Sequence, residues 1–148
     1  MADLELVRRL AAADHNLAVL AVARLDGTVQ ASVVSAGVIE DPVDGAPGVG
    51  AVVVGNAHKL RLLRDTGMAT FVFKSGFEWV AVSGPVRLVG PDDGTALGLD
   101  VPELIRSVFR AAGGSHEDWD EFDRVMAAER RCAVFVPAER ISTNPGAR

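Results

Sequence analysis

The sequence predicts a mainly β domain with flanking helices, in which six antiparallel strands form a barrel. Three observations lead to this expectation. Six apolar runs are rich in valine and alanine, most of them are joined by short connections, and helical spacing is confined to four segments. Short connections favour antiparallel neighbours, because parallel strands need a long crossover. The 148 residues correspond to a single domain that spans positions 1–148.

The turn signals between these runs set the strand boundaries. The pair Asp26-Gly27 is typical of a hairpin turn. The segment Glu40–Gly48 contains two prolines, three acidic residues and two glycines, which indicates a loop. Gly84-Pro85 indicates a bulge or an edge kink. The predicted strands are Leu17–Arg24, Thr28–Ile39, Val49–Val54, Ala69–Lys74, Phe77–Val89 and Arg131–Val136.

Four segments have apolar residues at helical spacing. Gly67 and the pair Gly113-Gly114 fit as the stops of two of these helices. The polar segment Ser142–Arg148 is expected to be a loose tail. The long apolar runs predict strands covered on both faces, by helices or by a second subunit, and we expect a homodimer. The predicted helices are Asp3–Ala13, Ala57–Asp65, Val101–Ala112 and Asp118–Arg130.

Composition excludes several classes of protein. The net charge is −5 and the basic residues form no long stripe, so nucleic acid is not an expected partner. No apolar run approaches the ~20 residues of a membrane-spanning helix, and Met1–Leu10 lacks the apolar region of a signal peptide, so a cytoplasmic location is expected. A lone cysteine, Cys132, and three widely spaced histidines predict no metal site. Tyrosine is absent, which excludes a tyrosine proton donor.

The segment Gly55–Asp65 is the candidate binding motif. A glycine and an asparagine end a strand, and the helix that follows offers free N–H groups and the positive end of its dipole. His58 and Lys59 fall in its first turn, and Arg61 and Arg64 share one edge. This pattern predicts a phosphate site. An ordinary amphipathic helix with a solvated basic face explains the same pattern, and spacing alone leaves both interpretations open.

Three pieces of the sequence, taken in order, resemble a known superfamily. They are the hairpin Val22–Ser32, the helix His58–Asp65 and the paired strands Phe71–Val86. The set resembles the pyridoxamine 5'-phosphate oxidase-like split-barrel superfamily and, more narrowly, its flavin/deazaflavin oxidoreductases that use coenzyme F420. The resemblance spans nearly the whole chain. It implies a homodimeric split barrel with two cofactor sites in grooves between the subunits.

The resemblance also implies which residues bind the cofactor. Ser32 and Val33 would lie against its ring. Relatives often place serine or threonine and then arginine before the phosphate-binding lysine, whereas this chain has Ala57-His58, which removes a hydroxyl and a permanent charge. Arg61 or Arg64 would compensate. The remaining implied cofactor-binding residues are the turn Gly55, Asn56, Ala57 and His58, the phosphate lysine Lys59, and Ser75 and Trp79 near the cofactor of the other subunit.

The implied function is that of an F420-dependent oxidoreductase. Hydride would pass from the reduced deazaflavin to an electron-poor, unsaturated small molecule, and the protein would bind, orient and exclude water. No residue is predicted to be catalytic, because the sequence shows no acid–base pair. Three alternatives stay open: FMN as the cofactor, a non-catalytic protein that binds F420 or a flavin, and a domain that keeps only the dimer.

Overall fold

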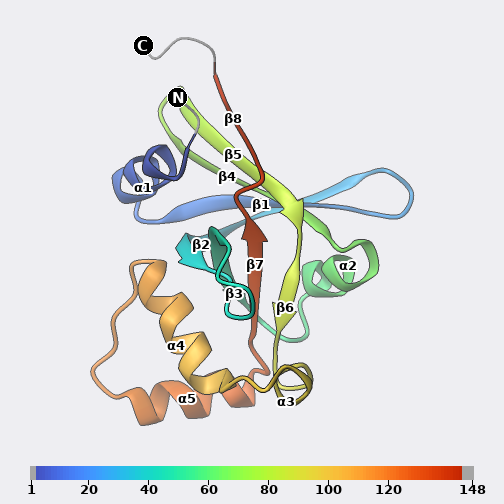
Figure 1. Cartoon of the computed structure of the whole chain (residues 1–148), viewed down its shortest axis with the longest axis vertical. Helices are drawn as coiled ribbons and strands as arrows, with labels where there is room; N and C mark the ends of the chain where they lie inside the picture. The colour runs from blue at the N-terminus through green and yellow to red at the C-terminus, as the bar shows by residue number, and fades with distance from the viewer. Residues whose placement is uncertain (1–2, 145–148) are drawn as a thin grey trace.

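The computed structural model describes residues 3–144 and shows one curled antiparallel sheet with helices around it (Figure 1). The eight strands are ordered β6-β7-β3-β2-β1-β4-β5-β8. Their bounds are β1 Leu17–Ala23, β2 Val29–Glu40, β3 Pro47–Val53, β4 Met68–Ser75, β5 Glu78–Pro85, β6 Arg87–Val89, β7 Cys132–Pro137 and β8 Arg140–Thr143. The helices are α1 Leu4–Ala13, α2 His58–Thr66, α3 Gly94–Leu97, α4 Val101–Ala111 and α5 Trp119–Ala128.

The long strand β2 connects the two halves of the sheet. Its first part pairs with β1, up to the pair Leu17↔Ser35, and its second part pairs with β3 from Ala36↔Ala51 onward. The curl brings β5 toward β7, because a Cβ added to Gly84 would lie 3.5 Å from the carbonyl oxygen of Pro137. The sheet is therefore a split barrel, as the sequence predicted.

Two apolar clusters hold the fold together. Alternate residues of β1, β4 and β5 point into the barrel, where Phe71 and Phe73 are fully buried with ring centroids 6.5 Å apart. The second cluster lies between β7 and the helices α4 and α5, and includes Phe122 and Phe135. All but the last residue of β7 are buried. The expectation that some strands are covered on both faces is confirmed, and here the cover is helical.

The predicted count of six strands is wrong, because the expected strand Phe77–Val89 is two strands. Pro85 has no backbone N–H to donate to a neighbouring strand. The N–H of Val86 donates to the carbonyl of Gly67 at 2.9 Å, outside the sheet. The chain then leaves β5 and continues as β6, which pairs with β7.

The C-terminal segment supplies the other additional strand. The expected loose tail Ser142–Arg148 is wrong at its start, because β8 pairs with β5 in the register Ala81↔Ser142 and Val80↔Thr143. The Thr143 hydroxyl also donates to the carbonyl of Trp79. This pairing satisfies the outer edge of β5, which would otherwise expose its backbone groups. Residues 145–148 lie outside the described residues.

Smaller differences concern the ends of elements. The predicted hairpin at Asp26-Gly27 is confirmed, with Gly27 at φ 88°. Pro47, expected in a loop, already pairs with Glu40 of β2. The short helix α3 was not among the predicted helices. In residues 3–144, no helix combines the length and the apolar character that crossing a membrane requires.

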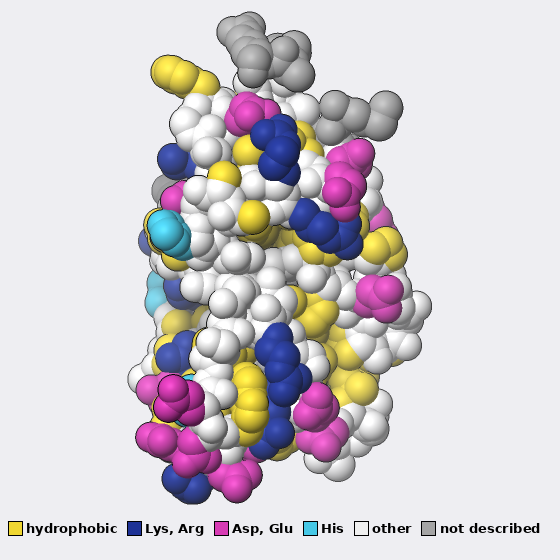
Figure 2. Space-filling view, turned by 90° about the vertical axis from the view of Figure 1, so that its left-hand side faces the viewer, with side chains coloured by type: hydrophobic (Ala, Val, Ile, Leu, Met, Phe, Trp, Pro, Cys, Tyr) yellow, Lys and Arg dark blue, Asp and Glu magenta, His cyan; other side chains and the backbone are white. Residues whose placement is uncertain are grey.

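One face of the surface bears on the partner prediction. On the face shown in Figure 2, side chains of both signs are interspersed, and acidic groups gather at the lower end. That nucleic acid is not a partner stays a prediction.

Candidate functional site

Two predicted site residues meet in the folded chain. Lys59 is the second residue of α2, Ser32 lies on β2, and the Lys59 Nζ donates to the Ser32 Oγ at 2.8 Å. Among residues 3–144, no carboxylate lies within ion-pair distance of Lys59. Partial burial lowers the pKa of Lys59, because it disfavours the charged form. An ammonium group in this setting is stabilised by an arriving anion.

The N-terminus of α2 lacks the side-chain cap that the longer helices have. Aspartates cap α1, α4 and α5, whereas Ala57 at the start of α2 makes no capping hydrogen bond. Because the alanine side chain at position 57 cannot cap the helix, the first N–H groups of α2 are open to a ligand. His58 and Asn56 in the same turn are exposed. Packing requires a glycine at position 55, because a Cβ there would lie 2.3 Å from the carbonyl oxygen of Arg130.

Beside this helix end lies a groove of about 350 Å³, which we call the lysine groove. Its walls are mainly apolar and include two cationic side chains, Lys59 and Arg131. The exposed Val33 belongs to its wall, as the resemblance implied for a ring-contacting residue. The lining comprises residues 33–35 of β2, 52–54 at the end of β3, Ala57, Lys59, Phe109, Ala112, Met126 and Arg131.

Sequence reasoning missed the helical side of this groove. Phe109 and Met126 come from α4 and α5, and Arg131 immediately precedes β7; none of the three was predicted as a site residue. In the sequence, Gly37 inside a predicted strand could have indicated that a helix packs closely against that strand. A Cβ at Gly37 would lie 1.9 Å from the carbonyl oxygen of Ala111, so α4 sits directly on β2. A glycine inside a strand is a recognised sign of such an approach.

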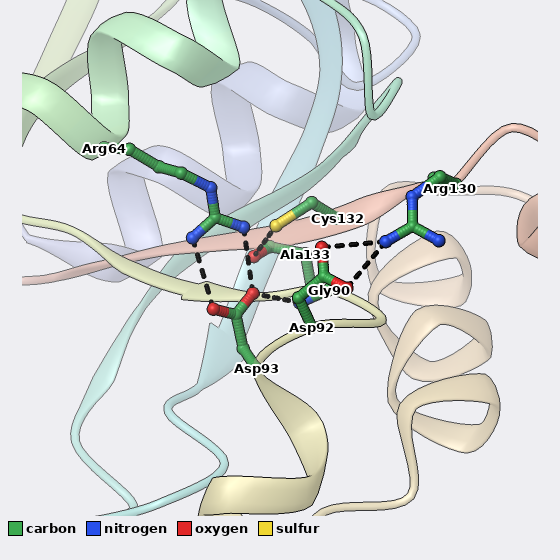
Figure 3. Close-up of polar contacts among 7 residues, drawn as sticks. All are labelled: Arg64, Gly90, Asp92, Asp93, Arg130, Cys132 and Ala133. Atoms are coloured by element: carbon green, nitrogen blue, oxygen red, sulfur yellow. Dashed lines mark hydrogen bonds and ion pairs between the residues drawn. The ribbon is translucent and has the colours of Figure 1, made fainter.

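The predicted arginines lie outside the lysine groove. The Arg64 guanidinium binds Asp93 through two hydrogen bonds of 3.2 and 3.0 Å (Figure 3). The second oxygen of Asp93 also accepts the N–H of Gly90 at 2.8 Å. Arg64 therefore ties α2 to the turn before α3. Arg61 is exposed and makes no ion pair with any residue between 3 and 144.

This pair makes stability depend on pH. The Arg64 guanidinium holds the pKa of Asp93 below its usual range, so the unfolded chain binds this proton more readily. The contribution is present above the unfolded pKa of about 3.9 and is lost as the pH falls through the lower folded pKa. We expect Asp93→Asn to lower the free energy of unfolding by about 1 kcal/mol at pH 7, because the pair is partly exposed. The loss should shrink as the pH falls below about 4.

Urea unfolding at several pH values measures this effect. Asp92→Asn is the matched control, because the neighbouring Asp92 pairs with Arg130 with both side chains more than half exposed (Figure 3). The control should change stability by less than about 0.5 kcal/mol. An Asp93→Asn loss that stays constant down to acid pH would contradict the assignment.

Ser75 and Trp79 lie in a different part of the chain. They belong to the β4–β5 hairpin and line a hollow of about 520 Å³ together with Phe77, Glu78 and Asn144. The strands β1 and β4 separate β5 from β2 in the sheet. One chain therefore does not bring Ser75 and Trp79 to the lysine groove. That they contact the cofactor of a second subunit stays a prediction.

Comparisons with known proteins agree on the fold. No family model matches the chain. A conserved hypothetical protein, Rv2991 of Mycobacterium tuberculosis, matches with a TM-score of 0.64 at 17% identity, over 95% of this chain and 89% of that one. A pyridoxamine 5'-phosphate oxidase-related, FMN-binding protein of Nostoc punctiforme matches with a TM-score of 0.60 at 11% identity, over 94% and 80%. An F420 reductase matches with a TM-score of 0.57 at 15% identity, over 88% and 91%.

These likenesses define the class of fold. The chain shares a split-barrel fold with the pyridoxamine 5'-phosphate oxidase-related, FMN-binding protein and with the F420 reductase.

Proposed function

We propose that the protein is an F420-dependent oxidoreductase that binds the cofactor phosphate at Lys59 and the ring in the lysine groove. The observation that carries the proposal is the Lys59 ammonium, which is partly buried, held by Ser32 and free of any carboxylate partner among residues 3–144. When bound, reduced F420 would supply a hydride to an electron-poor, unsaturated small molecule. The fold likeness to an F420 reductase supports this cofactor.

The chain's own residues have distinct tasks in this proposal. Lys59 and the open N–H groups of α2 hold the anionic end of the cofactor. Ser32 fixes the direction of the Lys59 side chain. Val33, Phe109 and Met126 form apolar walls that exclude water from the ring. Arg61 is exposed at the same helix end and adds positive charge around the phosphate, whereas Arg64 stabilises α2.

We propose that the protein acts as a homodimer. In one chain, Phe77 is 98% exposed at the tip of the β4–β5 hairpin, and Val33 is 64% exposed at the groove. Covering these side chains with a second copy would remove apolar area from water, which is favourable. A second copy that covers them would bring Ser75 and Trp79 toward the cofactor of its partner.

FMN is the alternative cofactor, because it offers the same groove a flat ring and a phosphate. The likeness to an FMN-binding protein supports this alternative. A non-catalytic F420- or flavin-binding protein would use the same residues without turnover. Titration with F420, FMN and haem, read from the fluorescence of Trp79 and Trp119, distinguishes the cofactors. Oxidation of reduced F420 in the presence of unsaturated acceptors then distinguishes an enzyme from a binding protein.

The variant Lys59→Met tests the proposed phosphate site. Losing a charge-assisted hydrogen bond should cost about 1.5–3 kcal/mol, or roughly 10- to 150-fold in cofactor affinity. The same change should leave the fold equally stable or more stable, because it removes a cation whose burial is unfavourable. Isothermal titration and urea unfolding measure the two effects.

Arg124→Met is the matched control. It removes the same charge from an exposed position on α5 that does not line the lysine groove. Affinity in this control should match that of the unchanged protein. Equal cofactor affinity in Lys59→Met and Arg124→Met would contradict the phosphate site and support the alternative, in which α2 is an ordinary amphipathic helix with a solvated basic face.

A further inference from the structure

A second cavity, of about 380 Å³, lies among the helices α3, α4 and α5, and we call it the helical cavity. Its walls are mainly apolar and include Leu99, Val101, Ile105, Met126 and Ala127. It shares Met126 and Arg131 with the lysine groove, but Lys59 is not part of its lining. None of the predicted cofactor-binding residues lines it.

The charged groups in its wall already have partners. Arg106 donates to Asp123 through two hydrogen bonds. The carboxylate of Asp100 accepts the N–H of Glu103 as the N-cap of α4. The Nε of Arg131 donates to Glu129 at 2.8 Å. An ionised ligand would therefore enter without a free charge of the opposite sign, which is unfavourable in an apolar cavity.

One polar feature of the wall is available to a ligand. The terminal amino groups of Arg131 make no hydrogen bond to residues 3–144, although its Nε does. A guanidinium has five N–H donors, so these groups can donate to a ligand carbonyl or hydroxyl.

The helix α3 packs directly against α4 beside the cavity. A Cβ added to Gly94 in α3 would lie 2.2 Å from the Cγ2 of Val101, so α3 and α4 are in direct contact. Ile105 is only 2% exposed and anchors α4 in the second apolar cluster. The volume lies in the range of small-molecule sites and is too small for a folded segment of another protein.

From these observations we propose that the helical cavity is a binding site for a neutral, largely apolar small molecule with one hydrogen-bond acceptor directed at Arg131. This site is distinct from the cofactor site, and the proposal does not depend on the proposed function.

Two dyes with the same ring system test the proposed ligand class. N-phenyl-1-naphthylamine is neutral, and 1-anilinonaphthalene-8-sulfonate adds a negative charge. We expect the neutral dye to bind about tenfold or more tightly than the sulfonate, because the charge of Arg131, the cation of the lining, is already paired with Glu129. Fluorescence titration of the Lys59→Met variant measures both affinities, so that the ammonium of the lysine groove does not bind the sulfonate. Tighter binding of the sulfonate by this variant would overturn the proposal.

Matched variants locate the site. Ala127→Trp should fill the helical cavity and abolish binding of the neutral dye, whereas Ala128→Trp, on the exposed next residue, should leave it unchanged. Lys59→Met should also leave it unchanged. Loss of binding in Lys59→Met with retention in Ala127→Trp would place the dye in the lysine groove and overturn the proposal.

Methyl NMR gives a readout on the unchanged protein. The chain has three isoleucines, of which Ile105 lines the helical cavity and Ile141 lies on β8. Binding of the neutral dye should shift the Ile105 δ1 methyl signal and leave the Ile141 signal in place. An unmoved Ile105 signal at saturating dye would contradict the proposed site even if Ala127→Trp failed to fold.

Discussion

Replacing Gly37 with alanine is expected to separate α4 from β2 and to destroy the lysine groove. The new Cβ would lie 1.9 Å from the carbonyl oxygen of Ala111 and 2.5 Å from its carbon. Both are backbone atoms, so relief requires the whole end of α4 to move. Overpacking of this kind costs about 1–3 kcal/mol, and we expect the upper part of that range because backbone meets backbone. Phe109 and Ala112, which line the groove on this helix, should move with it.

Urea unfolding and cofactor titration measure the two consequences together. Gly84→Ala is the matched control, because Gly84 also lies in a strand but its added Cβ would meet its nearest atom at 3.5 Å, an ordinary contact. The control should change neither the free energy of unfolding nor the cofactor affinity appreciably. A Gly37→Ala variant with unchanged stability and unchanged affinity would show that α4 does not hold the groove in place.

Replacing Phe77 with aspartate is expected to convert the proposed homodimer into monomers. Phe77 is 98% exposed in one chain, so a dimer that buries it gains most of the side chain's apolar area. Truncating a central aromatic anchor costs about 2–4 kcal/mol of association, and burying an unpaired carboxylate adds to this cost. The dissociation constant should therefore rise by about 30-fold or more. Sedimentation equilibrium measures the change.

The fold of the single chain should tolerate this change. Because Phe77 makes little contact within the chain, Phe77→Asp should leave the unfolding of the monomer unchanged. Val125→Asp, at a partly exposed position on α5, is the control and should keep the oligomeric state. If the unchanged protein sediments as a monomer, or Phe77→Asp remains a dimer, the proposed subunit arrangement is wrong.

Local patterns predicted most of the fold but failed where strands depend on neighbours distant in the sequence. The apolar run that forms β1 and the Asp26-Gly27 turn were enough to place a hairpin and a barrel wall. Gly84-Pro85 indicated a bulge or a kink, but not that the strand ends there, because the N–H of Val86 donates to the carbonyl of Gly67, whose position depends on α2. β8 was missed for a similar reason, since a polar segment becomes a strand only when the free edge of β5 is beside it.

The sequence by itself determined that Lys59 lies in the first turn of a helix that follows a strand, with an apolar side facing the core and no aspartate to cap it. That information is local, because it depends on spacing along one short segment. The tertiary structure alone decided which groups join Lys59. It brought Ser32 to within 2.8 Å, directed Arg64 to Asp93, and placed Arg131 in the wall of the groove. Such contacts depend on strand register and helix packing, which local residue patterns do not specify.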